Sequence, residues 1–191
     1  MVTVTQSRNI VFETERLIIR PANTADCNFY LALWTNPEVM KHVGFPRGIP
    51  ITYYEIKARL NRQGETAFDA LLVIEIKTSG KVIGECKLER PNEAGFVEPD
   101  IKLLPAFWGQ GYGSEAWAGI VSYEFTHTNC EGIATTPNVE NIAAIKLYEA
   151  ADAVCEGEGV YEFPEHMRKL TTPVHHFWYC LYRSVWEKNN H

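Results

Sequence analysis

The sequence predicts a mixed α/β (α+β) fold in a single domain, and three observations support this. The 191 residues show no internal repeat, low-complexity tract or linker. Stretches with the period-two pattern of strands alternate with stretches of helical periodicity. The central part reads as strand, glycine-rich turn, helix, strand and helix, an order typical of domains in which helices pack on a sheet.

The first half of the chain begins with a strand and two helices. Residues 12–22, FETERLIIRPA, alternate apolar and polar side chains up to Pro21. Thr24 is a suitable N-cap for a helix that stops at Asn36-Pro37. Thr52 and Glu55 form a capping box at the start of the next helix. The segments ALLVIEI and KVIGECKLE, separated by KTSG, then predict a β-hairpin.

The second half of the chain continues with strands and amphipathic helices. FVEPDIKLL, residues 96–104, predicts a strand. After a group of glycines, apolar residues recur at helical spacing from Trp117 to Phe125. EGIATT predicts a short strand, VENIAAIKLYEAA a helix, and PVHHFWYCLYR, residues 173–183, a final strand.

Composition and charge exclude several classes of protein. The net charge of −6 is spread along the chain, which disfavours nucleic acid as a partner because phosphate binding needs clustered lysine and arginine. No uncharged stretch reaches the ~18 residues that span a membrane. The five cysteines are scattered without a CxxC pair, so we expect no disulfide framework and no metal site. With no secretory signal pattern at the N-terminus, a cytoplasmic location is expected.

The glycine-rich turn, GQGYGS, is a candidate phosphate site. A helix N-terminus exposes unpaired N–H groups and the positive end of the helix dipole, and glycines let an anion approach without a Cβ in the way. Gly109, Gly111 and Gly113 meet this requirement, and Ser114 adds a donor. No lysine follows, which excludes a Walker A loop, and a Rossmann fingerprint would have glycine in place of Ser114. From the residues alone, a tightly packed loop is the alternative.

Together with its neighbours, the turn resembles the central motif of the GNAT superfamily of acyl-CoA N-acyltransferases. A second motif of that superfamily, Asn-x-x-Ser/Ala-x-x-Leu-Tyr-Glu, matches NIAAIKLYE, residues 141–149. The details are similar to the branch that includes ribosomal-protein N-terminal acetyltransferases. The residues of the first motif are Glu98, Leu103, Pro105, Phe107, Trp108-Gly109-Gln110-Gly111-Tyr112, Gly113 and Glu115-Ala116.

The resemblance runs from about residue 12 to about residue 183 and implies one N-acetyltransferase domain over residues 1–191. It implies a central, mostly antiparallel sheet of about six to seven strands with a V-shaped splay, flanked by about four helices. It also implies acetyl-CoA as co-substrate and no metal. The residues that would bind acetyl-CoA are Ile101, Lys102, Leu103, Trp108, Gly109, Gln110, Gly111, Tyr112, Gly113, Ser114, Asn141, Ala144 and Tyr148.

The resemblance further implies two catalytic residues. An amine with a pKa near ~10 must lose a proton before it attacks a thioester, and Glu98 matches the family position for this base. Asp100 is expected two residues along on the same face of the strand. Pairing of the two carboxylates is then expected to raise the pKa of Glu98 or of Asp100. Tyr148 matches the residue that protonates the departing thiolate. Pro99 lacks an N–H and is expected at a bulge in the strand.

The sequence leaves the acceptor and the oligomeric state open. Acceptors compatible with the resemblance are small amines and peptide or protein N-termini, and acidic residues near the slot favour a cationic one. The alternative function is a catalytically silent acyl-CoA-binding sensor, suggested by the unusual Pro99, Asp100 and Asp152. The apolar residues 177–186 allow a homodimer, although burial within a monomer is preferred.

Overall fold

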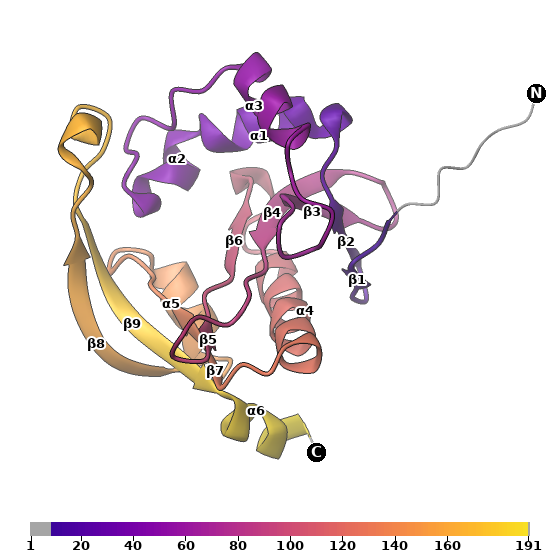
Figure 1. Cartoon of the computed structure of the whole chain (residues 1–191), viewed down its shortest axis with the longest axis vertical. Coiled ribbons are helices and arrows are strands. Elements are labelled where there is room, and N and C mark those ends of the chain that lie inside the picture. The colour runs from indigo at the N-terminus through magenta and orange to yellow at the C-terminus, as the bar shows by residue number, and fades with distance from the viewer. Residues whose placement is uncertain (1–8, 191) are drawn as a thin grey trace, which may run out of the picture.

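The computed structural model describes residues 9–190 and confirms the mixed α/β fold (Figure 1). In chain order the strands are β1 (Phe12–Glu13), β2 (Leu17–Pro21), β3 (Leu72–Ile76), β4 (Val82–Lys87), β5 (Phe96–Val97), β6 (Asp100–Leu103), β7 (Gly132–Thr135), β8 (Val154–Tyr161) and β9 (Val174–Tyr182). The helices are α1 (Cys27–Trp34), α2 (Pro37–Met40), α3 (Tyr53–Leu60), α4 (Tyr112–His127), α5 (Ile142–Glu149) and α6 (Arg183–Asn190).

The strands form two sheets. The first has the order β1-β2-β3-β4-β6 and is antiparallel throughout. The second has the order β5-β7-β9-β8, in which only the β5–β7 pair is parallel. The described residues hold nine strands and not the six to seven expected, because the segment 12–22 divides into β1 and β2 and the segment 96–104 into β5 and β6. The second division is the V-shaped splay that the resemblance implied.

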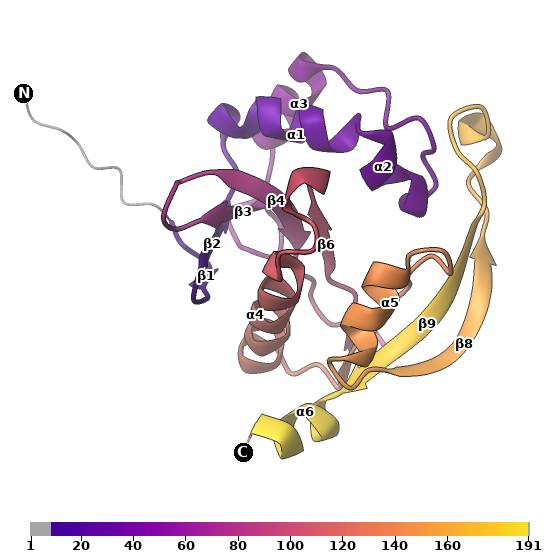
Figure 2. The same ribbon diagram turned by 180° about the vertical axis from the view of Figure 1, so that it is seen from behind.

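The helices cover the first sheet on both faces (Figures 1 and 2). Val73 of β3 packs in one apolar cluster with α1 and α3, whereas its neighbours Leu72 and Ile74 pack in another with α4. Successive side chains of a strand point to opposite faces, so the two clusters lie on opposite sides of this sheet. The opposing helices thereby hold β6 in place at the sheet edge.

Capping explains where the early helices begin. Thr52 and Glu55 form the expected capping box at the start of α3. The prediction of Thr24 as the N-cap of the first helix is wrong. Asn23 caps instead: its side chain accepts from the N–H of Ala25, and Asp26 completes a capping box within a 3₁₀ turn, Thr24–Asp26. The cap therefore lies one residue earlier than predicted, and the buried face of the helix is the one that the sequence indicated.

The β8–β9 hairpin curves away from the body and returns towards the end of α2 (Figure 2). Its tip is held there by the N–H of Thr172, which donates to the carbonyl of Gly44 at 2.9 Å, and by Arg47, which donates to the carbonyl of Lys169 at 2.9 Å. The rings of Phe45 and Phe163 pack edge to face 5.5 Å apart. The hairpin therefore connects the second sheet to the loop that follows α2.

No helix among residues 9–190 is both long and apolar enough to cross a membrane.

Candidate active site

The site lies where the chain passes from one sheet to the other. Val97 pairs with Ile133 in the second sheet, and three residues later Asp100 pairs with Lys87 in the first. Between them Pro99 is buried and has no N–H to contribute to either ladder, as expected at a break in a strand. A cavity of about 820 Å³ opens at this split. Its walls come from the α2 end, β6, the glycine turn, the end of β7 and α5.

The outer edge of β6 forms one wall of the cavity. The N–H of Leu104 donates to the carbonyl of Ile83 on β4, so by strand alternation the backbone groups of Ile101 and Leu103 point to the free edge. The N–H of Ile101 donates to its neighbour Asp100 at 2.8 Å, and the carbonyl of Leu103 accepts from the indole of Trp108 at 2.8 Å. A ligand that pairs with this edge as an extra strand would compete with these two local bonds.

The glycine turn, residues 109–114, runs into α4, which begins at Tyr112. The backbone conformation accounts for the presence of glycine at two of its three glycine positions. Gly109 has a φ of +70° and Gly111 a φ of +78°, both in the left-handed region that favours glycine. Gly113 lies in the helix itself. A Cβ there would meet only Leu103, at an ordinary 3.7 Å, and no atom lies within 4 Å of a Cβ at Gly109. Folding does not require glycine at 113, so we expect that a ligand needs the space.

Arg16 stands beside the turn, although it lies far away in the sequence. Its guanidinium donates to the Glu115 carboxylate at 2.5 Å and to the carbonyl of Gln110 at 3.1 Å, and it stacks over the Tyr112 ring at 4.5 Å. Gln110 and Tyr112 contact Arg16 and do not line the cavity, whereas Gly109, Gly111 and the other predicted turn residues do. Arg16 could not be predicted from the sequence because the contact joins the turn between β1 and β2 to the start of α4, about a hundred residues along the chain.

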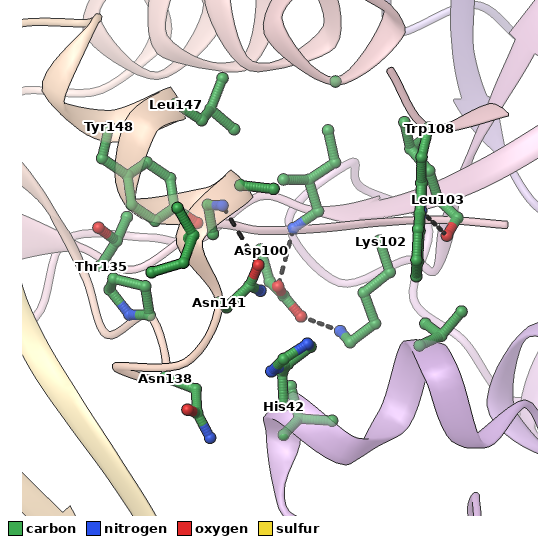
Figure 3. A pocket seen from close by; sticks show the side chains of 18 of the residues that line it. His42, Asp100, Lys102, Leu103, Trp108, Thr135, Asn138, Asn141, Leu147 and Tyr148 are labelled. Carbon is green, nitrogen blue, oxygen red and sulfur yellow. Dashed lines mark hydrogen bonds and ion pairs between the residues drawn. The ribbon is translucent and has the colours of Figure 1, made fainter. Parts of the chain in front are cut away.

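A buried row of charges runs from α1 through the sheet to the cavity. The indole of Trp34 donates to both oxygens of Glu85, at 3.1 and 3.0 Å, and the Lys102 ammonium lies 3.3 Å from the same carboxylate. Lys102 also pairs with Asp100, which faces the cavity (Figure 3). Burial lowers the pKa of Lys102, but the two carboxylates outweigh it and raise that pKa well above its ordinary value. The lysine is therefore a fixed cation.

The pKa values of the two acids in this row, Glu85 and Asp100, are shifted in opposite directions. Burial raises the pKa of Glu85, against the opposing effect of Lys102. Burial also disfavours the charged form of Asp100, but the charge and hydrogen bond of Lys102 outweigh it and hold the pKa of Asp100 below its ordinary value. The expectation that Asp100 would have a raised pKa beside Glu98 is wrong for Asp100. Its partner is a cation from its own strand, which the spacing of acids alone could not indicate.

Helix α5 brings the second motif to the cavity. The Asn141 side chain caps the helix by accepting from the N–H of Ala144 at 3.2 Å, and both residues line the cavity. Tyr148 is buried, with its ring 4.9 Å from that of Trp117, and it also borders the cavity (Figure 3). Burial, with a further contribution from Asp100, raises the pKa of Tyr148, so its hydroxyl stays protonated and is able to donate.

Glu98 and three further side chains complete the cavity on the side away from the glycine turn. Glu98 is exposed at the split, and its charge contributes, after burial and Glu156, to the raised pKa of Cys180. Thr135, at the end of β7, is 7 % exposed, and its hydroxyl has no hydrogen-bond partner among residues 9–190. Glu38 and His42 line the cavity from α2 and the 3₁₀ turn that follows it, Lys41–Val43.

The structure thus brings the predicted residues together from both motifs. Glu98, Tyr148, Asn141 and Ala144 share the cavity with Ile101, Lys102, Leu103, Trp108, Gly109, Gly111, Gly113 and Ser114. His42, Thr135 and Arg16 were not anticipated. The segment around His42, NPEVMKH, shows no spacing that would single out its histidine. No group of three potential metal ligands occurs in the part of the chain that the structure describes.

Comparison with known families now identifies the class of protein. The pattern of the Acetyltransferase (GNAT) domain matches residues 16–154. The chain belongs to the GNAT acetyltransferase family, and the enzyme class predicted from the sequence, an acetyl-CoA-dependent N-acetyltransferase, is confirmed. A curated relative, the uncharacterized N-acetyltransferase p20 of Bacillus licheniformis, is 28% identical over 149 residues, which span 75% of this chain and 82% of the relative.

Solved structures show the same fold at low sequence identity. A GNAT-family acetyltransferase from Bacillus anthracis has a TM-score of 0.72 and 18% identity over 90% of this chain and 98% of its own. Spermidine N-acetyltransferase from Vibrio cholerae, solved in complex with CoA and spermine, has a TM-score of 0.74 and 23% identity, with the same coverage. These matches give no support to the ribosomal-protein branch or to the silent sensor.

Proposed function

We propose that the protein transfers an acetyl group from acetyl-CoA to a primary amine of a cationic small molecule or peptide N-terminus, by direct attack in a ternary complex. One observation carries this proposal. A single cavity joins the glycine turn and the free edge of β6 to a wall that bears carboxylates and a histidine. Such a cavity has one end suited to a phosphorylated thioester and another suited to an amine.

The residues present fit acetyl-CoA at the first end. A Cβ at Gly109 would meet no atom within 4 Å and one at Gly113 would meet only Leu103, so the start of α4 leaves room for a ligand, and the helix dipole and the nearby Arg16 favour an anion there. The pantetheine arm would pair with the edge of β6 at Ile101 and Leu103, displacing the Trp108 indole from the Leu103 carbonyl. Asn141, whose side-chain oxygen already caps α5, retains its NH₂ group for the same arm.

Two side chains are proposed to handle protons, as the sequence predicted. Glu98, beside the split, attracts the ammonium of the acceptor, and it matches the family position for the base that takes the ammonium proton. The free amine then attacks the thioester carbonyl carbon, a C–N bond forms, and the C–S bond breaks. Tyr148, which remains protonated, donates to the departing sulfur, and the proton that the new amide nitrogen loses restores the phenol.

The lining of the cavity favours a cationic acceptor. Four carboxylates border it: Glu38, Glu98, Asp100 and Glu140. Lys102 neutralises Asp100, and Lys41 pairs with Glu38 at 2.8 Å, which leaves Glu98 and Glu140 without an ion-pair partner among residues 9–190. The V. cholerae neighbour was solved with spermine, a polyamine. A di- or polyamine therefore belongs in any first panel of acceptors.

The proposal is tested first by calorimetric titration of acetyl-CoA into the wild type and two variants of Gly113. Gly113→Ala adds a methyl group that folding tolerates, and Gly113→Trp fills the space in front of the helix N-terminus. We expect binding by the wild type, modest weakening in Gly113→Ala and at least about 100-fold weakening in Gly113→Trp. A wild type that is folded and does not bind acetyl-CoA would overturn the proposal.

Turnover is then measured as thiol release with a panel of primary amines that includes spermidine and a short peptide. Glu98→Gln and Tyr148→Phe are each expected to lose at least about 100-fold in kcat, with acetyl-CoA binding retained. Tight binding without turnover of any amine would favour the sensor alternative.

A further inference from the structure

His42 borders the cavity from the side opposite to the two GNAT motifs. It lies in the 3₁₀ turn after α2, and its imidazole points towards the Asp100–Lys102 pair (Figure 3). The glycine turn, β6 and α5 form the wall proposed for acetyl-CoA, so a group that reaches the cavity from α2 faces the position of the acceptor. The role of His42 is therefore a question about the acceptor.

Few side chains at this end of the cavity can accept a proton. Asp100 is bound to Lys102, which stabilises its charged form and makes it a weaker base than an ordinary aspartate. Lys102 is itself fully charged and has no lone pair to offer. Glu38 is held by Lys41, which lowers its pKa. Glu98, Glu140 and His42 remain.

The surroundings of His42 favour its neutral form. Burial lowers its pKa, and Lys41 in the same turn adds to this effect. Glu140, from the loop before α5, and Glu38, from α2, oppose it without reversing the direction. On the β6 side, the charges of Asp100 and Lys102 form a pair. Because the pKa of His42 lies below its ordinary value of about 6.5, most of the imidazole is uncharged at neutral pH. A neutral imidazole is a stronger base than a carboxylate.

We propose that His42 is a catalytic residue that takes the proton from the ammonium group of the acceptor amine; this rests on the proposed acetyl transfer. The ammonium N–H bond breaks and the proton passes to a ring nitrogen of His42, leaving the nitrogen lone pair free to attack the thioester carbon. Tyr148 again donates its proton to the departing sulfur, and the proton that the new amide nitrogen loses restores the phenol. The imidazolium then releases its proton to solvent, and Glu98 holds the ammonium before transfer.

The test is the pH dependence of kcat/KM in the wild type, His42→Gln and Glu98→Gln, with spermidine or whichever panel amine reacts fastest. His175→Gln is the matched control, because His175 is exposed on the hairpin and contacts Glu158 at 3.2 Å. We expect His42→Gln to lose about 100-fold at pH 7 and to lose an ionisation below pH 6.5 that the wild type and His175→Gln retain. Retention of that ionisation in His42→Gln, and its loss in Glu98→Gln, would overturn the inference.

A second acceptor separates proton transfer from a structural role. Hydroxylamine is a small amine that is uncharged at neutral pH and needs no base to free its lone pair. His42→Gln should therefore turn over hydroxylamine within about threefold of the wild type, after subtraction of the uncatalysed reaction. An equal loss with both acceptors would overturn the inference. Acetyl-CoA binding in the same variant is expected to be unchanged, and a wild type that acetylates no amine would instead overturn the proposed function itself.

Discussion

Replacing Glu124 by glutamine is expected to make the free energy of unfolding fall less as the pH rises from 5 to 9. Glu124 lies in α4 with no exposed surface. One carboxylate oxygen accepts from the N–H of Glu89 at 2.8 Å, and the other has no hydrogen-bond partner among residues 9–190. Burial raises the pKa of this carboxyl group from 4.5 to about 8. The folded protein therefore holds Glu124 as the neutral acid at pH 7.

The magnitude follows from the linkage between protonation and folding. A carboxyl group whose pKa is raised on folding contributes stability that is fully present below pH 4.5 and is lost as the pH rises through 8. At about 1.36 kcal/mol per pH unit, the interval from 4.5 to about 8 corresponds to a loss of at most about 5 kcal/mol. Glutamine keeps the acceptor for the Glu89 N–H and has no charge to lose.

The assay is urea unfolding, followed by tryptophan fluorescence, at five pH values from 5 to 9. The free energies of unfolding of the wild type and Glu124→Gln should agree within about 1 kcal/mol at pH 5 and diverge by several kcal/mol in favour of Glu124→Gln at pH 9. Glu93→Gln, on an exposed loop, controls for a change of net charge. Parallel pH curves for the wild type and Glu124→Gln would refute the reasoning, because they would mean that Glu124 ionises equally in both states.

Three further predictions concern the cavity. Lys102→Met leaves Glu85 and Asp100 without their shared cation, so the free energy of unfolding at pH 8 should fall by about 3–5 kcal/mol. The decrease should be smaller at pH 5, because the carboxylates that have lost their cation take up protons there. Thermal unfolding at both pH values checks this. Tyr148→Phe keeps the ring contact with Trp117, so its melting temperature should stay within about 3 °C of the wild type. Phe163→Ala loosens the hairpin tip and should raise KM for the acceptor several-fold without changing KM for acetyl-CoA, and a reversed pattern in steady-state kinetics would contradict this.

Contiguous motifs were the part of the site that could be predicted from the sequence. The glycine turn and the helix after it form one segment, so the unpaired N–H groups of the helix N-terminus and the glycines beside them are neighbours in the chain. Asn141 and Tyr148 lie on one short helix, so their common approach to the cavity follows from their spacing. An irregularity at Pro99 was also expected, because proline cannot donate to a strand ladder, but the expected bulge is in the structure a full break between β5 and β6.

The charges of the site could not be predicted in this way. A pKa depends on burial and on charges within a few ångströms in space, and neither is encoded in spacing along one segment. Asp100 was expected to have a raised pKa, and the pairing of its own strand with β4 gave it the Lys102–Glu85 pair instead. His42 reaches the cavity only because α2 packs above the end of the splay.

The sequence by itself determined the family, the fold class, the glycine turn before a helix and the helix that carries Tyr148, because each of these depends on residues close together in the chain. The tertiary structure alone decided that segment 96–104 divides between two sheets, that Arg16 stands beside the turn, that Asp100 pairs with a lysine, and that burial lowers the pKa of His42. The physical reason is that these properties arise from packing between elements up to about a hundred residues apart, where through-space charge and burial, and not local backbone preference, set the outcome.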